Sequence, residues 1–383
     1  MSDTISDRTT APPPGAKKPV TGMTPLEVEI RRRIKAAGPM PIGEYMALCL
    51  FDPEHGYYTT NDPLGAGGDF ITAPEISQMF GELIGVWMAA VWKQMGSPES
   101  VRLIELGPGR GTMMKDALRA LKVMPGFNEA ISLHLVEINP LLMSQQQRTL
   151  EHVTLPIAWH SALSEVPDGP SIIVANEFFD ALPVNQAVKR EDGWHTRCVG
   201  IGAENQLAFA IAPEPIPQFD SVLPPALHDV PADSIFEWRD DKSAMDLGRR
   251  VADNGGAALV IDYGHSVSVV GDTLQAVGRH AYFDVLTAPG TIDITALVDF
   301  EALANAVEAM GAEAYGPIVQ ARLLRRLGIE TRAEALKTKA SHATANDIDL
   351  ALARLIGAGR SGMGMLFKAA AYTHPSFGTP PAF

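Results

Sequence analysis

The sequence predicts an α/β fold: a mainly parallel sheet with helices on both faces. Three observations predict this class. From residue 101 onwards, short runs rich in β-branched residues alternate with helical segments, as in parallel sheets with crossover helices. The first run is joined to its helix by a glycine-rich turn, a common strand-to-helix connection. The chain has 383 residues, 46% of them hydrophobic, which is enough for a large core.

The chain before this alternation is predicted to be helical. Residues 1–22 are Pro-rich and polar, which is typical of a disordered tail. A capping box at Thr24, followed directly by proline, predicts a helix over 25–37. After a second short helix and a Gly- and Pro-rich loop, a long amphipathic helix is expected to begin at Pro74. Residues 23–96 therefore form a predicted N-terminal helical region.

Residues 97–383 contain the predicted sheet. Its strands are expected at "VRLIEL", "SLHLVEI", "SIIVANEF" and "AALVIDYG", with a last strand, "MGMLFKAAAY", closing the sheet. Residues 183–235 break the rhythm, because antiparallel strands joined by turns replace the strand–helix pairs. We expect this segment to be a hairpin inserted into the main sheet.

Composition excludes several classes of function. Lys and Arg total 31 against 45 Asp and Glu, a net charge of −14, so sequence-independent binding to a phosphate backbone is not expected. Two cysteines indicate a reducing compartment, and no apolar run is long enough for membrane insertion. Residues 1–22 contain acidic residues, unlike a mitochondrial presequence. A cytoplasmic location in a bacterium is predicted, with the mitochondrial matrix as the alternative.

The turn "ELGPGRG" carries the first candidate binding residues. Gly107, Gly109 and Gly111 let the backbone turn sharply and approach a ligand closely. The spacing is G-x-G-x-G, whereas the dinucleotide fingerprint is G-x-G-x-x-G, and no P-loop pattern is present. Glu105 places a negative charge beside the turn, which suits a cation better than a pyrophosphate. The predicted cofactor is S-adenosylmethionine, with NAD as the disfavoured alternative.

Two further strand ends carry candidate residues. Glu137, followed by Ile138, ends the next strand, where a carboxylate can accept hydrogen bonds from ribose hydroxyls. Asn176 and Glu177 follow an apolar strand, and Asp180 comes shortly after two phenylalanines. Such polar groups can hold a flat cationic nitrogen group through charge-assisted hydrogen bonds. The alternative is that Asn176 caps a turn and the phenylalanines belong to the core.

Other polar residues lie where they could face a substrate. They are Asp262, Tyr263, His265, Gln275, His280 and Asp293. The ten histidines are scattered without metal-ligand spacing, and no nucleophile elbow is present, so neither a metal site nor covalent catalysis is predicted.

Several motifs in chain order resemble one family. "GGDFITAPEISQMFGELIG", "IELGPGRG", "VEINP", "NEFFDALPV", "VIDYG", "TLQA", "DIT" and "MGMLFK" are similar to the MidA family of S-adenosylmethionine-dependent methyltransferases. The resemblance implies a class I (Rossmann-like) fold with an antiparallel C-terminal strand and an N-terminal helical region covering the pocket. It also implies cofactor binding at Gly107, Pro108, Gly109 and Glu137. The family includes the mitochondrial arginine methyltransferase required for assembly of respiratory complex I.

The resemblance also implies a reaction. The predicted acceptor is an arginine of a protein, with a complex I subunit as a candidate. Glu177 would orient the guanidinium group, and Asp180 or His280 would assist or accept the released proton. Two alternatives stay open: an assembly factor that binds the cofactor with little catalysis, and an NAD-dependent oxidoreductase. The oligomeric state and the number of methyl groups added are also left open.

Overall fold

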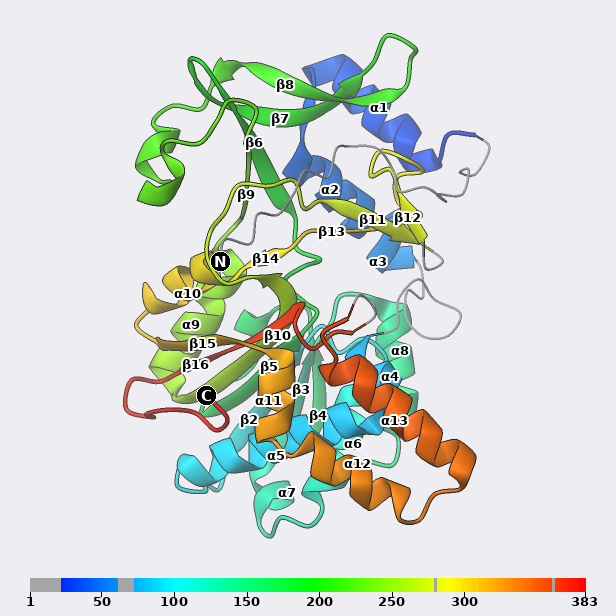
Figure 1. Ribbon diagram of the computed structural model, residues 1–383, viewed down its shortest axis with the longest axis vertical. Helices are drawn as coiled ribbons and strands as arrows, with labels where there is room; N and C mark the ends of the chain where they lie inside the picture. The colour runs from blue at the N-terminus through cyan, green and yellow to red at the C-terminus, as the bar shows by residue number, and fades with distance from the viewer. Residues whose placement is uncertain (1–21, 61–71, 279–280, 360–361) are drawn as a thin grey trace.

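The computed structural model describes residues 22–60, 72–278, 281–359 and 362–383, and it divides them into two lobes (Figure 1). The lower lobe is built on a large mixed sheet with helices around it. The upper lobe combines smaller antiparallel sheets with N-terminal helices (Figure 1). The predicted tail, apart from Gly22, and the candidate base His280 lie outside the described residues.

The large sheet has the strand order β15-β16-β10-β5-β2-β3-β4. Its strands are β2 (Val101–Leu106), β3 (Ile131–Val136), β4 (Ile157–His160), β5 (Ser171–Asn176), β10 (Gly256–His265), β15 (Glu313–Val319) and β16 (Phe367–Thr373). Strands β2, β3, β4, β5 and β10 pair in parallel, whereas β16 runs antiparallel between β10 and β15. Short β14 (Val298–Asp299) pairs with the end of β10. The α/β class predicted from the alternation is confirmed.

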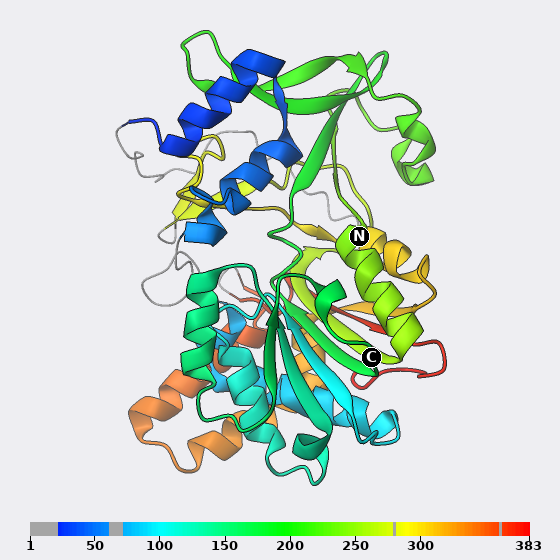
Figure 2. The same cartoon turned by 180° about the vertical axis from the view of Figure 1, so that it is seen from behind.

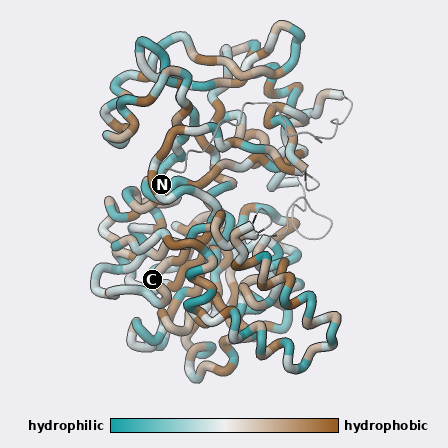
Figure 3. Tube along the Cα trace, viewed as in Figure 1, coloured by the Kyte–Doolittle hydropathy of each residue, from teal (hydrophilic) through white to brown (hydrophobic). Residues whose placement is uncertain are grey.

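Alternating side chains of the strands enter two separate cores. Leu103 and Leu259 belong to one apolar cluster, and Ile104 and Val260 belong to the other. This period of two places consecutive residues on opposite faces of the sheet. Residues of α5 (Gln78–Gln94), α6 (Thr112–Leu121), α11 (Gln320–Arg326), α12 (Ile329–Lys337) and α13 (His342–Ile356) pack in the first cluster; residues of α9 (Lys242–Asn254) and α10 (Phe300–Glu308) pack in the second. Figure 3 shows the apolar residues concentrated along these central strands.

The remaining helices of the lower lobe connect its strands (Figure 2). They are α7 (Phe127–Ala130), α8 (Pro140–Thr149) and the 3₁₀ turn Leu163–Glu165. The single helix predicted from Pro74 is wrong. It is divided into α4 (Ala73–Ile76) and α5 by Ser77, which is extended and caps α5 by accepting the N–H of Met79 at 3.2 Å.

The upper lobe is assembled from distant parts of the chain. It contains α1 (Pro25–Ala37), α2 (Ile42–Phe51), α3 (Tyr57–Thr60), β1 (Met40–Pro41), β6 (Val184–Arg190), β7 (Gly193–Ile201), β8 (Leu207–Pro215), the 3₁₀ turns Phe219–Ser221 and Pro225–Leu227, β9 (Ile235–Arg239), β11 (Gln275–Gly278), β12 (Ala281–Phe283) and β13 (Asp293–Thr295). The helix predicted over 25–37 is confirmed, with Thr24 accepting the N–H of Glu27 at 3.0 Å.

The antiparallel segment predicted over 183–235 does not join the main sheet. Strands β6 to β9 form a sheet of their own, in which β1 pairs with β7 at one edge and β9 pairs with β6 at the other. Because the apolar sides of α1 and α2 share a core with Val184 and Val199, the segment is buried against these helices instead. The antiparallel unit also runs on to Arg239. Among the described residues, no helix is long and apolar enough to cross a membrane.

Candidate active site

A cavity of about 410 Å³ lies where the two lobes meet. Its floor is the carboxyl edge of β2, β3 and β5, and residues of α2, α3 and β13 contribute to its lining from the upper lobe. The predicted site residues that line it are Glu105, Gly107, Pro108, Gly109, Glu137, Ile138, Asn176, Glu177 and Asp180. Gly111 lies next to it as the residue that precedes α6. The structure therefore brings the cofactor and catalytic candidates of the described residues to one place.

The glycine turn has the backbone conformation that requires glycine. Gly107, Gly109 and Gly111 have φ of 63°, 54° and 79°, in the left-handed region that side chains disfavour. A Cβ at position 107 would lie 3.0 Å from the ring of Phe178. The turn is closed by the N–H of Gly111, which donates to the carbonyl of Pro108 at 2.8 Å. The missing side chains keep the cavity floor open beside the turn.

Glu105 is a buried carboxyl group at this floor. The residue is 3% exposed, and its Oε2 atom has no hydrogen-bond partner among the described residues. Burial, with Glu137 nearby, raises the pKa of Glu105 to about 8. A buried carboxyl group without a partner is costly to ionise unless a cation or a donor approaches it. Glu105 thus fits a ligand that brings positive charge or N–H groups.

Glu137 has internal partners that the sequence did not indicate. Its carboxylate accepts the N–H groups of Ile138 at 2.9 Å and Asn139 at 2.8 Å, and the side-chain amide of Gln146 at 3.1 Å. Gln146 also donates to the carbonyl of Gly109 at 2.7 Å, which joins α8 to the glycine turn. These bonds fix the carboxylate at the cavity wall and leave acceptor capacity on its second oxygen.

Glu177 occupies a strained turn directly after β5. Its φ of 52° is unusual for a residue with a side chain, and such strain is found most often at functional sites. The carboxylate accepts the N–H of Ala73 at 3.3 Å and the amide of Asn176 at 3.2 Å. Burial and the neighbouring Asp180 raise the pKa of Glu177 to about 8. Glu177 can therefore hold or release a proton near neutral pH.

Asp262 holds this turn from behind. Its carboxylate accepts the N–H groups of Phe179 at 3.0 Å, Asp180 at 3.2 Å and Tyr263 at 2.9 Å. The sequence suggested that Asp262 could face a substrate, but the structure uses it to anchor the backbone. Tyr263 does line the cavity, and its hydroxyl group bonds to Asp180.

Arg239, which sequence analysis missed, joins the upper sheet to the same turn. Its guanidinium group donates to the carbonyl oxygens of Leu182 at 3.2 Å, Leu297 at 2.8 Å, Asp180 at 3.3 Å and Ala296 at 2.7 Å. Arginine suits this role because its rigid fork presents several donors at once. The signal in the sequence was weak, since a single arginine at the end of a strand is common on protein surfaces.

The upper lobe contributes aromatic and acidic groups to the lining. Phe51 and Tyr58 line the cavity from α2 and α3, with ring centroids 5.9 Å apart, and Asp293 lines it from β13. The sequence predicts Asp293 as a substrate-facing residue but carries no signal for the two aromatic residues. Their position depends on pairing between distant segments, which local patterns do not reveal.

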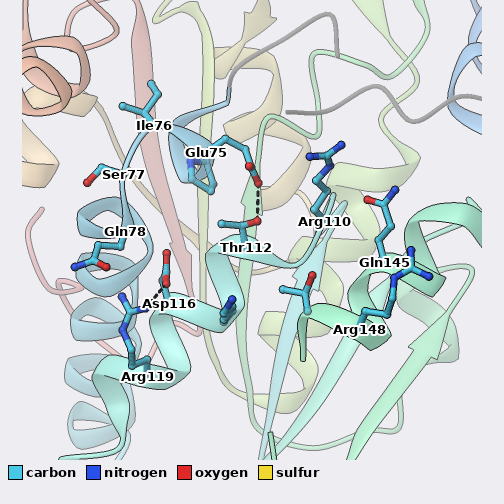
Figure 4. Close-up of a pocket in the computed structure, with 13 residues that line it drawn as sticks. Glu75, Ile76, Ser77, Gln78, Arg110, Thr112, Asp116, Arg119, Gln145 and Arg148 are labelled. Carbon is cyan, nitrogen blue, oxygen red and sulfur yellow. Dashed lines mark hydrogen bonds and ion pairs between the residues drawn. The ribbon is translucent and has the colours of Figure 1, made fainter. Parts of the chain in front are cut away.

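A second, more open hollow of about 700 Å³ adjoins the cavity (Figure 4). It is lined mainly by α4, α6 and α8, and it shares Pro74, Glu75, Arg110 and Thr112 with the cavity. Figure 4 shows Glu75 turned toward Thr112, whose hydroxyl donates to its carboxylate at 2.5 Å. This bond ties α4 to the start of α6, so the break at Ser77 places α4 at the edge of the cofactor turn.

Comparison with known proteins identifies the family. Residues 83–318 match the model of a family described as "Putative S-adenosyl-L-methionine-dependent methyltransferase". The chain belongs to this family. The match extends from α5 into β15 and includes the glycine turn, Glu137 and the Glu177 turn. The enzyme is an S-adenosylmethionine-dependent methyltransferase, and the resemblance to MidA proteins is confirmed.

Relatives and solved structures agree with this assignment. The chain is 38% identical over 354 residues to the rat "Protein arginine methyltransferase NDUFAF7, mitochondrial", covering 83% of this chain and 77% of the relative. It is also 38% identical over 351 residues to the human protein of that name, covering 85% and 78%. A crystal structure of a Burkholderia thailandensis protein bound to S-adenosyl-homocysteine matches with a TM-score of 0.82, 28% identity and 94% of each chain covered. These matches set aside the NAD alternative.

The residues of the cavity fit S-adenosylmethionine. The unpartnered Oε2 of Glu105 and Oδ1 of Asn176 can accept from a ligand, and the glycine turn leaves room for close approach. Glu137 keeps acceptor capacity for hydroxyl groups. We infer that these groups hold the cofactor when it is bound.

Proposed function

We propose that this enzyme methylates an arginine side chain of a protein. The observation that carries the proposal is the Glu177 turn, which places two carboxyl groups, Glu177 and Asp180, in the cavity that contains the glycine turn. Carboxylates bind the planar guanidinium group through charge-assisted hydrogen bonds. The names of the rat and human relatives, protein arginine methyltransferases, support the same acceptor.

The strand order of the large sheet supports a class I (Rossmann-like) methyltransferase fold. The order β4-β3-β2-β5-β10-β16-β15, with only β16 reversed among the strands described for this path, is what a class I (Rossmann-like) methyltransferase requires. In such open sheets, ligands bind beyond the carboxyl ends of the strands, where the strand order reverses. Here the order reverses between β2 and β5. Glu105 lies near the carboxyl end of β2, and Gly107 and Glu177 directly follow β2 and β5.

The chain's own residues have three tasks. S-adenosylmethionine, when bound, supplies an electrophilic methyl group. Glu177 would accept N–H groups of the guanidinium and hold its nitrogen in place, a contribution of orientation. Asp180, whose Oδ1 has no partner among the described residues, would take the proton that the guanidinium loses. Phe51 and Tyr58 would exclude water from above.

Glu177→Gln tests this proposal. Transfer of labelled methyl groups to arginine-containing proteins should fall by a factor of about 100 or more, because Gln cannot orient the cation with a charge. Affinity for S-adenosylmethionine, measured by calorimetry, should stay within about two-fold. Asp246→Asn is the matched control, since Asp246 lines the same cavity but pairs with Lys242 and Arg249. A Glu177→Gln enzyme with the full transfer rate would refute the role of Glu177.

An assembly factor with little catalysis is the second candidate. It is favoured only by the large upper lobe, which offers a surface beyond the cavity (Figure 1). A chain that binds S-adenosylmethionine but transfers no label to any protein would support it. The complex I subunit as acceptor, and a bacterial cytoplasmic or mitochondrial location, stay predictions; the relatives' names state a mitochondrial location for those proteins.

A further inference from the structure

Thr273, the first residue of the "TLQA" motif, makes hydrogen bonds in two directions. Its hydroxyl donates to Oε2 of Glu237, and its N–H donates to Oε1 of the same carboxylate at 3.1 Å. The hydroxyl also accepts the N–H of Leu297 at 2.9 Å. Thr273 therefore joins β9 of the upper sheet, which contains Glu237, to the segment that follows β13.

That segment, Ala296 and Leu297, holds the backbone of Asp180. The carbonyl oxygens of Ala296 and Leu297 accept from Arg239 at 2.7 and 2.8 Å. The N–H of Ala296 donates to the carbonyl of Asp180 at 3.3 Å, and Arg239 donates to the same carbonyl at 3.3 Å. The two donors that hold this carbonyl are thus both bonded to the segment that Thr273 fixes.

Asp180 is held from the lower lobe as well. Asp262 accepts its N–H at 3.2 Å, and the hydroxyl of Tyr263 bonds to its carboxylate. These bonds fix the amino side of the residue and one oxygen of its side chain. The carbonyl side depends on the upper lobe, so the direction in which the carboxylate points into the cavity is set from both lobes.

A buried network behind Thr273 fixes Glu237 in turn. Gln186, which is 0% exposed, donates to Oε1 of Glu237 and to Asp272 at 3.0 Å. Arg197 donates to Oε1 of Gln186 at 2.9 Å and to Asp272 at 2.8 Å. Such a network holds a single geometry when its donors face acceptors. It ties Thr273 to strands β6, β7 and β9.

We propose that Thr273 is a positioning residue for Asp180. Its hydroxyl suits this role because it donates to Glu237 and accepts from Leu297 at the same time, which an alkyl side chain cannot do. Without it the segment beside Asp180 would lose one of its ties to the upper sheet, and a catalytic group that shifts slightly loses much of its contribution to the rate. The inference rests on the proposed function, in which Asp180 takes the proton, and extends it to a residue outside the cavity lining.

Thr273→Val removes the hydroxyl and keeps the shape of the side chain. The probe is the arginine-containing peptide that wild type methylates fastest, chosen from an array. We expect kcat for this peptide to fall by a factor of about ten, while its KM and the affinity for S-adenosylmethionine stay within about two-fold. Thr273→Ser keeps both hydrogen bonds and should restore kcat to within about two-fold of wild type.

Ser171→Ala is the matched control for the loss of a buried hydroxyl group. The hydroxyl of Ser171 donates to the carbonyl of Gly169 at 2.8 Å and accepts from Arg250 at 3.1 Å. Ser171 begins β5, at the end of the strand opposite to Glu177. The variant should lower the unfolding free energy, measured with urea, and leave kcat unchanged.

A second variant keeps the test decisive if Thr273→Val does not fold. Glu237→Gln leaves one oxygen for the three donors that now share the carboxylate, so kcat should fall by a few-fold in the same way. Wild-type kcat in a folded Thr273→Val or Glu237→Gln enzyme, or an equal fall in Ser171→Ala, overturns the role of Thr273 and leaves arginine methylation intact. A wild-type enzyme that methylates no arginine peptide contradicts the proposed function itself, and this inference with it.

Discussion

Replacing Glu105 by Gln should stabilise the cofactor-free protein at high pH. The carboxyl group is 3% exposed and lacks a partner for Oε2 among the described residues, so ionising it in the folded state is unfavourable. A rise in its pKa from 4.5 to about 8 corresponds to about 5 kcal/mol when the group is fully ionised, at about 1.4 kcal/mol per pH unit. At pH 7.5 the raised pKa of Glu105 lowers the unfolding free energy by about 4 kcal/mol, because part of the carboxyl population stays protonated in the folded state.

The direction of the pH dependence follows from the raised pKa. The folded state binds the proton of Glu105 more tightly than the unfolded state does. The contribution of protonated Glu105 to the stability of the folded state is therefore complete below about pH 4.5 and is lost as the pH rises through about 8. Glutamine has the same shape and never ionises. The difference in unfolding free energy between Glu105→Gln and wild type should thus grow in favour of the variant from pH 5 to pH 9.

Urea unfolding at a series of pH values measures this difference. Other titrating groups are shared by both proteins, so they cancel in the comparison. Glu99→Gln, at an exposed position of the same lobe, is the control and should show no such trend. A variant that is no more stable than wild type at pH 9, or a difference that does not depend on pH, would refute the assignment of Glu105 as an unpaired buried carboxyl group.

Three other predictions concern the turns around the cavity. Gly107→Ala should weaken S-adenosylmethionine binding about ten-fold by calorimetry, because the new Cβ would approach Phe178 at 3.0 Å. Gly96→Ala is the control and should leave this affinity unchanged, since Gly96 is also left-handed but has nothing within 4 Å of a Cβ. Arg239→Lys should lower both the methyl-transfer rate and the unfolding free energy, the latter by about 2 kcal/mol, because it cannot bond all four carbonyls; a wild-type rate would contradict its positioning role. The kcat/KM of wild type should rise about ten-fold per pH unit up to about pH 8 and then level off, since Glu177 must be ionised. If kcat/KM of Glu177→Gln depended on pH in the same way, the requirement for ionised Glu177 would be contradicted.

Local patterns predicted much of the lower lobe, but not strands β4 and β15. Strands β2, β3, β5 and β10 are short apolar runs, and the turn at Gly107 needs a conformation that glycine supplies, so these features could be predicted from neighbouring residues. The break at Ser77 could not, because the amphipathic pattern continues through it and the capping bond to Met79 competes with a continuous helix.

The upper lobe was beyond local patterns for a different reason. Its sheet pairs Met40 with Val199, and its core joins α2 to β6 and β13, so its architecture depends on contacts between distant segments. The same holds for the bond between Tyr58 and Asp293. Asp262 is recognisable in the sequence as a polar residue at a strand end, but only the structure shows that its carboxylate holds the backbone of the Glu177 turn.

We propose that the enzyme transfers a methyl group from S-adenosylmethionine to a protein arginine, and that the reaction takes place at the carboxyl edge of the large sheet. The most direct test of this proposal is acid hydrolysis and amino-acid analysis of proteins labelled by the purified enzyme with radioactive S-adenosylmethionine. We expect the label to be recovered as methylarginine and to be absent with a Glu177→Gln enzyme that still binds the cofactor. Label recovered only in another amino acid, or methylarginine formed at the full rate by the variant, would contradict it.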